Sequence, residues 1–450
     1  MTLTVDAIRP ALDGAIPGAI ATCDPDGTPN VSYISQVEYV DSEHVALSFQ
    51  FFNKTRRNVL ANPQATVGVV HPLTGANYSL EVDYLRTETS GPLFERMKAR
   101  LAGIASHEGM SGVFRLQGSD VYRVRSIVEL PGTYLPPPPP RCNLLAASRK
   151  CSERIAACTH LDELLDTVLA SLESLFAIQH SMILLLDEPG KRLYTVASRG
   201  YDASGVGSEI ALGDGVIGVA AREGSPIRIC FMAPEYLYHR AMRKATAGTE
   251  FASKLETEIP FAGLEEPHSQ LAVPVKALQR VIGVLYVESS EDLHFSYDDE
   301  DALVAVAGQL GIAIHVLQAA SEAADEPPAR AQEPSVAQGP PLVVRHFGEN
   351  DSVFLDDDSL IKGVAGAILW TLVRDFVHVN RSDFSNRELR LDQRIRLPDV
   401  SDNLEARLIL LERRLTERGA ALRIVKTGRG RFRLTAQRPL QLVDVPAPRR

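Results

Sequence analysis

The 450-residue chain is poor in cysteine and contains no long uninterrupted apolar run. Its five cysteines include no Cys-x-x-Cys pair, which argues against a disulfide framework and against a tetrahedral zinc site. No segment approaches the roughly 18 consecutive apolar residues of a membrane span. The N-terminal segment also lacks the basic and apolar regions of a secretory signal. These absences predict a cytoplasmic protein with reduced thiols, without a metal site and without membrane association.

Charge is distributed unevenly along the chain. The net charge is −10 overall, but residues 341–450 contain 20 Lys and Arg against 15 Asp and Glu, which leaves −15 for the remaining residues. A basic C-terminal segment on an acidic body favours an anionic partner for that segment. An ordinary solvated basic surface is the alternative that charge alone leaves open.

Two proline-rich segments divide the chain. Residues 131–141 include five consecutive prolines, which favour a stiff polyproline II spacer. Residues 319–341 have too few apolar side chains to pack and are typical of a disordered linker. The segments predict three domains of ordinary size, which span residues 1–130, 142–318 and 342–445.

The first predicted domain contains many short alternating strands with turn residues between them. One amphipathic helix over residues 92–105 interrupts the strands, and the pattern predicts a small antiparallel β-barrel. Residues 53–63 lie where a strand ends and a short helix begins. The cations, the Thr55 hydroxyl and the free N–H groups of this segment suit a bound phosphate group. A solvated basic turn before a helix is the alternative.

The same segment, which ends in Asn62-Pro63, resembles the Lys…Asn-Leu…Asn-Pro signature of the pyridoxamine 5′-phosphate oxidase-like split barrels. The resemblance implies a homodimer that binds FMN, or less often the deazaflavin F420 or haem, at the subunit interface. It assigns these residues to the cofactor: Ser32, Tyr33, Ile34, Ser35, Ser48, Gln50, Lys54, Thr55 and Arg56. Many family members have a phosphate-binding arginine at the position of Ser32, and the true oxidase has a substrate-binding lysine at that of Val37. These departures argue against pyridoxamine oxidase activity.

The second predicted domain begins with a long helix over residues 142–175 and ends with a capped apolar helix. The glycine-rich run at residues 213–218 is not a dinucleotide fingerprint, because no βαβ unit surrounds it. The order of elements resembles the GAF sensor family, which implies an α/β sandwich with a small-molecule pocket. The insertion at residues 231–267 would cover that pocket, and its ligand candidates are Tyr236, Tyr238 and His239. Exposed loop positions are the alternative for these three residues.

The third predicted domain has the order helix, helix, helix and hairpin, with the hairpin turn at residues 428–430. This order and the Gly-x-Gly turn resemble the winged-helix effector domain of response regulators. The resemblance implies that the third helix enters the major groove of double-stranded DNA while the wing contacts phosphates. The DNA-binding candidates are Asn403, Arg407, Arg414, Arg418, Arg429, Arg431 and Arg433. A winged helix that binds protein is the alternative, because acidic residues dilute the basic face.

The fold class predicted for the whole chain is multi-domain α+β, with a split β-barrel, a GAF α/β sandwich and a winged helix-turn-helix. The predicted function is a one-component regulator, in which a ligand or redox signal changes the geometry of a dimer and its binding to DNA. An FMN-dependent oxidoreductase with regulatory domains is the alternative from the enzyme class. Its chemistry would belong to the cofactor, because no nucleophile–base pair or paired carboxylates stand out. A scaffold for protein partners is a third possibility.

Overall fold

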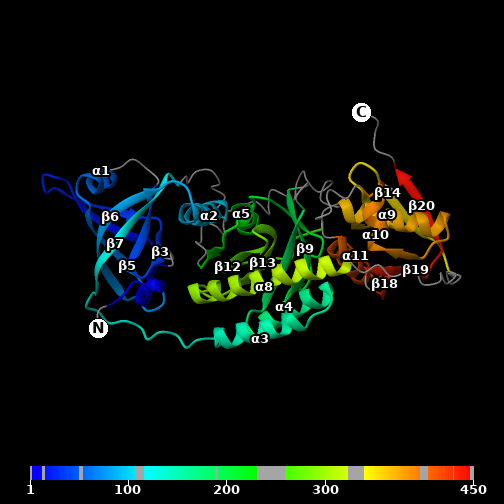
Figure 1. Cartoon of the computed structure of the whole chain (residues 1–450), viewed down its shortest axis with the longest axis horizontal. Helices are drawn as coiled ribbons and strands as arrows, with labels where there is room; N and C mark the ends of the chain where they lie inside the picture. The colour runs from blue at the N-terminus through cyan, green and yellow to red at the C-terminus, as the bar shows by residue number, and fades with distance from the viewer. Residues whose placement is uncertain are drawn as a thin grey trace.

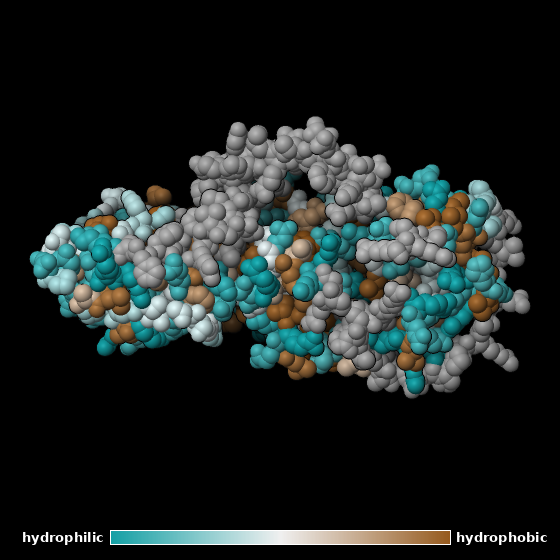
Figure 2. Space-filling view, turned by 90° about the horizontal axis from the view of Figure 1, so that it is seen from above, coloured by the Kyte–Doolittle hydropathy of each residue, from teal (hydrophilic) through white to brown (hydrophobic). Residues whose placement is uncertain are grey.

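Three units lie in a row in the computed structural model, with the N-terminal unit at one end and the C-terminal unit at the other (Figure 1). The structure describes residues 3–12, 16–49, 54–107, 116–187, 191–230, 259–322, 339–395, 404–428 and 430–445. On the face seen in Figure 2, hydrophilic and hydrophobic residues are interspersed across all three units.

The N-terminal unit is a seven-stranded antiparallel sheet in the order β2-β1-β5-β6-β7-β4-β3. Alternate residues of β5, such as Val67 and Val69, are buried in its core, as the period of two predicts. The strands are β1 (Gly18–Cys23), β2 (Pro29–Ile34), β3 (Val37–Asp41), β4 (His44–Phe49), β5 (Gln64–Val70), β6 (Asn77–Glu88) and β7 (Gly118–Glu129). The helices are the 3-10 helix η1 (Asp6–Leu12), α1 (Lys54–Ala61) and α2 (Pro92–His107). The predicted strand-rich domain and its interrupting helix are confirmed.

The central unit is a six-stranded antiparallel sheet in the order β10-β9-β8-β13-β12-β11. One face packs against α4 and α8, which α3 covers in turn, and the other face packs against α5. The strands are β8 (His180–Asp187), β9 (Arg192–Arg199), β10 (Glu209–Ala211), β11 (Ile227–Ile229), β12 (Ser269–Ala277) and β13 (Arg280–Ser289). The helices are α3 (Leu144–Ala157), α4 (Leu161–Phe176), α5 (Gly215–Glu223) and α8 (Tyr297–Glu322).

The single long helix predicted over residues 142–175 is wrong, because the chain forms two helices there. The Asn143 side chain caps α3 by accepting a hydrogen bond from the N–H of Ala146. At the other end, Cys158 leaves the helical conformation for extended backbone, and α4 begins only at Leu161. The break lets α3 pack on α4 and α8 while α4 lies against β8 and β9.

Helix α8 runs along the sheet and is longer than its predicted domain, since it ends at Glu322 rather than at residue 318. By length and composition alone, its segment Tyr297–Ala320 is apolar enough to cross a membrane. In the structure it packs against β12, α3 and α4, and core helices of soluble domains pass the same test.

The C-terminal unit contains two small sheets, ordered β16-β15-β14-β20 and β17-β19-β18. The strands are β14 (Leu342–Phe347), β15 (Ser352–Leu355), β16 (Asp358–Ile361), β17 (Asp383–Ser385), β18 (Leu422–Gly428), β19 (Arg431–Ala436) and β20 (Leu440–Val445). The helices are α9 (Gly363–His378), α10 (Asn386–Leu391) and α11 (Leu404–Glu417). The predicted order of three helices and a hairpin is confirmed, and a capping box formed by Ser385 and Glu388 starts α10.

The three units pack directly against one another. Helix α2 of the N-terminal unit contacts α5 and β11 of the central unit. Helix α11 of the C-terminal unit contacts α4 and β9 on the opposite side, and the buried apolar cores of these two units are continuous. Segments far apart in the sequence therefore meet at two junctions.

Candidate functional site

The first candidate site lies where β2 meets the start of α1. The Nδ2 of Asn30 donates to the Thr55 hydroxyl at 2.9 Å, and the hydroxyls of Ser32 and Thr55 are 2.7 Å apart. Lys54 is half-buried beside them, with its Nζ 4.0 Å from a carboxylate oxygen of Asp24. Hydroxyls, an ammonium group and the first turn of a helix are groups that hold a phosphate. The structure therefore brings together Ser32, Lys54 and Thr55.

Arg56 points away from this corner into the sheet. Its guanidinium pairs with Asp120, donates to Thr87 at 2.7 Å, and lies over the rings of Phe49 and Tyr84. Burial raises the pKa of the Asp120 carboxyl, although Thr87 and Arg56 oppose this shift. Arg56 is thus held in a buried ion pair, and in this structure it is not one of the groups at the phosphate corner.

The other residues assigned to the cofactor do not converge. Ile34 is buried in the core of the sheet, which is contrary to a role beside a ligand. Ser35 and Tyr33 are exposed on the outside of the unit. Ser48 is partly buried and its hydroxyl has no hydrogen-bond partner in the described part of the chain. Gln50 lies outside the described residues.

The second candidate site is in the central unit, at the end of β13. The carboxylate of Glu288 is 2% exposed. It accepts a hydrogen bond from the Tyr286 hydroxyl at 2.8 Å and another from the backbone N–H of Leu264 at 2.8 Å. Among the described residues, no lysine, arginine or histidine forms an ion pair with it. Sequence analysis missed Glu288, because a glutamate in an apolar strand carries no motif. The candidates that it chose all lie outside the described residues: Tyr236, Tyr238 and His239.

Glu288 belongs to a row of polar side chains across three strands. Gln270 of β12 and His180 of β8 are its direct cross-strand neighbours. Directly opposed residues have their side chains on one face of a sheet, about 5 Å apart. Tyr201 contacts the His180 ring, with ring centroids 5.3 Å apart. Burial, followed by the charge of Glu288, raises the pKa of the Tyr201 phenol.

The third candidate site is the basic face of α11. The apolar face of this helix is buried: Leu404, Leu408, Leu411 and Leu415. The adjacent arginines, predicted to face DNA, are also buried, with Arg407 5% and Arg414 6% exposed. Arg407 lies 3.0 Å from a carboxylate oxygen of Asp187 and over the ring of Tyr194, both in the central unit. Helix α11 therefore presents this part of its basic face to the sheet of the central unit and not to solvent.

The remaining DNA-binding candidates are distributed over the C-terminal unit. Arg418 is exposed just after α11, and Arg431 is partly exposed on the hairpin. Arg433 pairs with Asp383 at 2.8 Å. Arg414 donates to the carbonyl oxygen of Leu360 at 3.2 Å, within its own unit. Two further candidates lie outside the described residues: Asn403 and Arg429.

Two more ion pairs join the C-terminal unit to the first turns of α4. Arg413 of α11 pairs with Asp166 at 2.7 Å and donates to the Val196 carbonyl oxygen at 3.2 Å. Lys426 of the hairpin pairs with Asp162 at 2.6 Å. A pocket open to solvent lies beside these contacts, between the N-terminal end of α4, the C-terminal part of α8, α11 and the hairpin. Basic residues of the C-terminal unit thus meet acidic residues of the central unit at several points of the junction.

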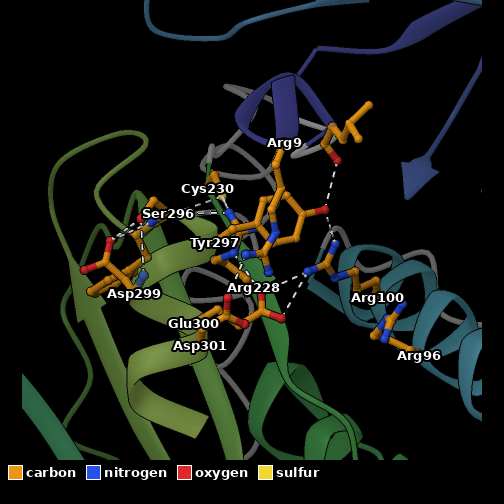
Figure 3. Close-up of polar contacts among 12 residues, drawn as sticks. Arg9, Arg96, Arg100, Arg228, Cys230, Ser296, Tyr297, Asp299, Glu300 and Asp301 are labelled. Atoms are coloured by element: carbon orange, nitrogen blue, oxygen red, sulfur yellow. Dashed lines mark hydrogen bonds and ion pairs between the residues drawn. The ribbon is translucent and has the colours of Figure 1, made fainter. Parts of the chain in front are cut away.

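The opposite junction is a buried network of charges. Arg100 of α2 and Arg228 of β11 both point at the carboxylate of Glu300 on α8, each with a nitrogen 2.9 Å from one oxygen (Figure 3). Arg100 also pairs with Glu38 of β3 at 2.7 Å, and its guanidinium lies over the ring of Tyr297. All of the charged partners in this network belong to ion pairs, so it joins the two units structurally. Within the described residues, no group of His, Cys, Asp and Glu side chains is arranged to hold a metal ion.

Two parts of the chain match protein-family models. Residues 4–123 match the pyridoxamine 5′-phosphate oxidase model, and residues 160–314 match the GAF domain model. No curated protein matches the chain.

Several solved structures are similar to single parts of the chain. The GAF domain of a phosphoenolpyruvate-protein phosphotransferase from Acinetobacter is 24% identical with a TM-score of 0.31, and the match covers 40% of this chain and 96% of that one. The free methionine-R-sulfoxide reductase from Neisseria meningitidis is 20% identical with a TM-score of 0.31, over 39% of this chain and 91% of that one. An FMN-binding protein from Syntrophomonas wolfei is 17% identical with a TM-score of 0.25, over 28% of this chain and 86% of that one. The two family-model matches show that the chain contains a pyridoxamine 5′-phosphate oxidase-like domain followed by a GAF domain.

Proposed function

We propose that the protein is a ligand- or redox-sensing one-component regulator whose C-terminal domain, a winged helix, binds double-stranded DNA as part of a homodimer. The observation that carries the proposal is the contact between α11 and the GAF domain. A helix that bears the DNA-binding candidates packs directly on a sensor domain, through Arg407 and Asp187 and through Arg413 and Asp166. A signal that changes the GAF domain would therefore change the accessibility of α11.

The aspartates of the GAF domain occupy the place that DNA phosphates would take. An arginine that pairs with a carboxylate also suits a phosphate oxygen, and Arg407 is only 5% exposed while α11 packs on the GAF domain. Binding of DNA through Arg407 would thus require α11 to leave the GAF domain. The protein would then have a closed state and an open state, and a ligand that binds one of them better shifts the balance.

The exposed Arg418 tests DNA binding without disturbing the closed junction. We expect the full-length protein to bind a random-sequence DNA duplex at low salt, with an affinity that falls as salt rises. The substitution Arg418→Ala should weaken binding and reduce the salt dependence by about one phosphate contact. Fluorescence anisotropy over a salt series measures both effects.

The matched control for this measurement is Arg149→Ala, which removes an exposed arginine from α3 in the central unit. It changes the net charge equally but lies outside the C-terminal unit, so its affinity should stay close to that of the wild type. Absence of DNA binding at low salt would reject the proposed output. Equal effects of the two substitutions would reject the assignment of Arg418.

A second candidate function, an FMN-dependent oxidoreductase, is favoured by the corner formed by Ser32, Lys54 and Thr55. Their two hydroxyls and ammonium group at the start of α1 fit the phosphate of FMN, which would supply electron transfer when bound. Exposed apolar side chains nearby support a subunit interface at this corner, because Val31 on β2 is 71% and Leu60 on α1 is 60% exposed.

Titration of the purified protein with FMN, followed by flavin fluorescence, tests this candidate. The wild type should bind FMN in about stoichiometric amount, and Lys54→Ala should weaken binding by about tenfold, because a charged hydrogen-bond partner of phosphate is lost. Arg57→Ala removes an exposed cation three residues further along the same helix and serves as the control. Equal FMN affinities for all three proteins would reject Lys54 as a phosphate-binding residue. Absence of FMN binding by the wild type would reject FMN as the cofactor.

A further inference from the structure

The GAF domain buries two glutamates, of which only one has cationic partners among the described residues. Glu300 is 7% exposed and pairs with both Arg100 and Arg228. Glu288 is 2% exposed, yet among the described residues it pairs with no cation. Its two hydrogen bonds come from the neutral Tyr286 hydroxyl and a backbone N–H. A buried carboxylate without a cation is costly, so its presence calls for a reason.

One direct neighbour of Glu288 has a buried acceptor without a partner among the described residues. The Oε1 of Gln270, a residue that is 7% exposed, has no hydrogen-bond partner in the described part of the chain. The Tyr201 phenol lies against the Glu288 carboxylate, and its pKa is raised by burial, by the charge of Glu288 and by a hydrogen bond to that carboxylate. Gln270 is the direct cross-strand neighbour of Glu288, so both side chains leave the sheet on the same face. Buried polar atoms without partners are rare in folded proteins.

We propose that this row binds the protonated amine of a small molecule, with Glu288 as the counter-ion and Gln270 as a second acceptor. An ammonium group supplies a positive charge to the Glu288 carboxylate and a donor to the Oε1 of Gln270. The site rests on the GAF part of the proposed function and is independent of DNA binding.

The surroundings of Glu288 suit a cation with an organic body. Tyr201 and Tyr286 lie beside the carboxylate, and the Phe261 ring contacts Tyr286 with centroids 6.3 Å apart. Aromatic faces attract an ammonium group and pack against apolar carbon. An anionic ligand would instead meet a like charge in a site of low dielectric constant. The row therefore selects amines over the matching alcohols and acids.

The first test compares the two buried glutamates without any ligand. Glu288→Gln should leave the unfolding temperature of the full-length protein unchanged or raised, because the new amide can donate to the Oε1 of Gln270 and no cation loses a partner. Glu300→Gln should lower it by several degrees, because two buried arginines lose their shared carboxylate. An equal decrease for both substitutions would overturn the proposal, since it would give Glu288 a purely structural role.

The second test uses phenethylamine as the probe, with 2-phenylethanol and 3-phenylpropionate as matched neutral and anionic compounds. In calorimetric titrations of the full-length protein, the amine should bind at least tenfold more tightly than either of the others. Glu288→Gln should abolish this preference, whereas Glu300→Gln, measured well below its unfolding temperature, should keep it. Failure of the amine to bind, or equal binding to both glutamine variants, would overturn the proposal. A protein that binds the amine but no DNA would sink only the proposed regulatory output.

Discussion

Buried charged residues of this protein fall into two kinds, according to whether an opposite charge lies beside them. Arg100, Arg228 and Glu300 satisfy one another where the N-terminal and GAF domains meet. Glu288 has hydrogen bonds but no counter-ion among the described residues. Composition cannot distinguish these two kinds of glutamate, because the difference lies in residues that are distant in sequence. Arg100 and Glu300 lie 200 positions apart in the sequence and come together only in the folded chain.

The Glu300 network predicts a loss of stability in acid. Burial alone would raise the pKa of Glu300, but Arg100 and Arg228 outweigh it and hold the pKa below the usual value. A carboxylate with a lowered folded-state pKa stabilises the protein above its unfolded pKa, about 4.3, and loses that effect as pH falls through the folded value. The difference in unfolding temperature between the wild type and Glu300→Gln should thus have its largest value at neutral pH.

Thermal unfolding from about pH 7 to pH 3 measures this difference, because the range spans the usual carboxyl pKa. The two proteins should converge at the acid end, where Glu300 is protonated and carries no charge. A difference that stays constant over the whole range would contradict the assigned ion pairs.

At the scale of helices and strands, sequence patterns predict some features of the fold and miss others. The strands of the N-terminal domain, the helix over residues 92–105 and the capping box at Ser385 could be predicted, because period and caps are local properties. The break between α3 and α4 could not, because both halves carry an apolar stripe. The apolar face of α11 was also predictable, but a helical pattern does not reveal whether the polar face meets solvent or a second domain. Arg407 and Arg414 are buried for that reason.

Helix α2 supplies the prediction at this scale, because it serves two domains. Met97 packs into the N-terminal domain, while Ala99 is fully buried in the apolar cluster of the GAF domain. A larger side chain at residue 99 would not fit, and overpacking costs typically 1–3 kcal/mol. Ala99→Phe should separate the two domains while each stays folded.

Small-angle X-ray scattering should then report a larger radius of gyration and unchanged secondary structure by circular dichroism. Ala305→Phe, at an exposed position of α8, is the matched control and should leave the radius unchanged. An unaltered radius for Ala99→Phe would show that α2 does not hold the domains together.

At the scale of the whole molecule, two junctions connect three units that the sequence presents as independent. The proline-rich segments predicted separate domains, and direct packing replaces that picture of modules on linkers. The N-terminal domain docks on α5 and β11, and α11 docks on α4 and β9 of the same GAF domain. A change inside the GAF domain can therefore reach both neighbours. Such contacts between domains cannot be predicted from one sequence segment, because each is formed by two surfaces from different parts of the chain.

The most direct measurement of this account is the DNA affinity of the full-length protein when α11 is released. Asp187→Asn removes the partner of the buried Arg407 and so destabilises the closed state. Asp202→Asn makes the same change of charge at an exposed position of the GAF domain. Fluorescence anisotropy should show Asp187→Asn binding a DNA duplex at least about fivefold more tightly than the wild type, a shift of roughly 1 kcal/mol, with Asp202→Asn close to the wild type. Equal affinities for all three proteins would contradict the proposal that the GAF domain holds α11 away from DNA.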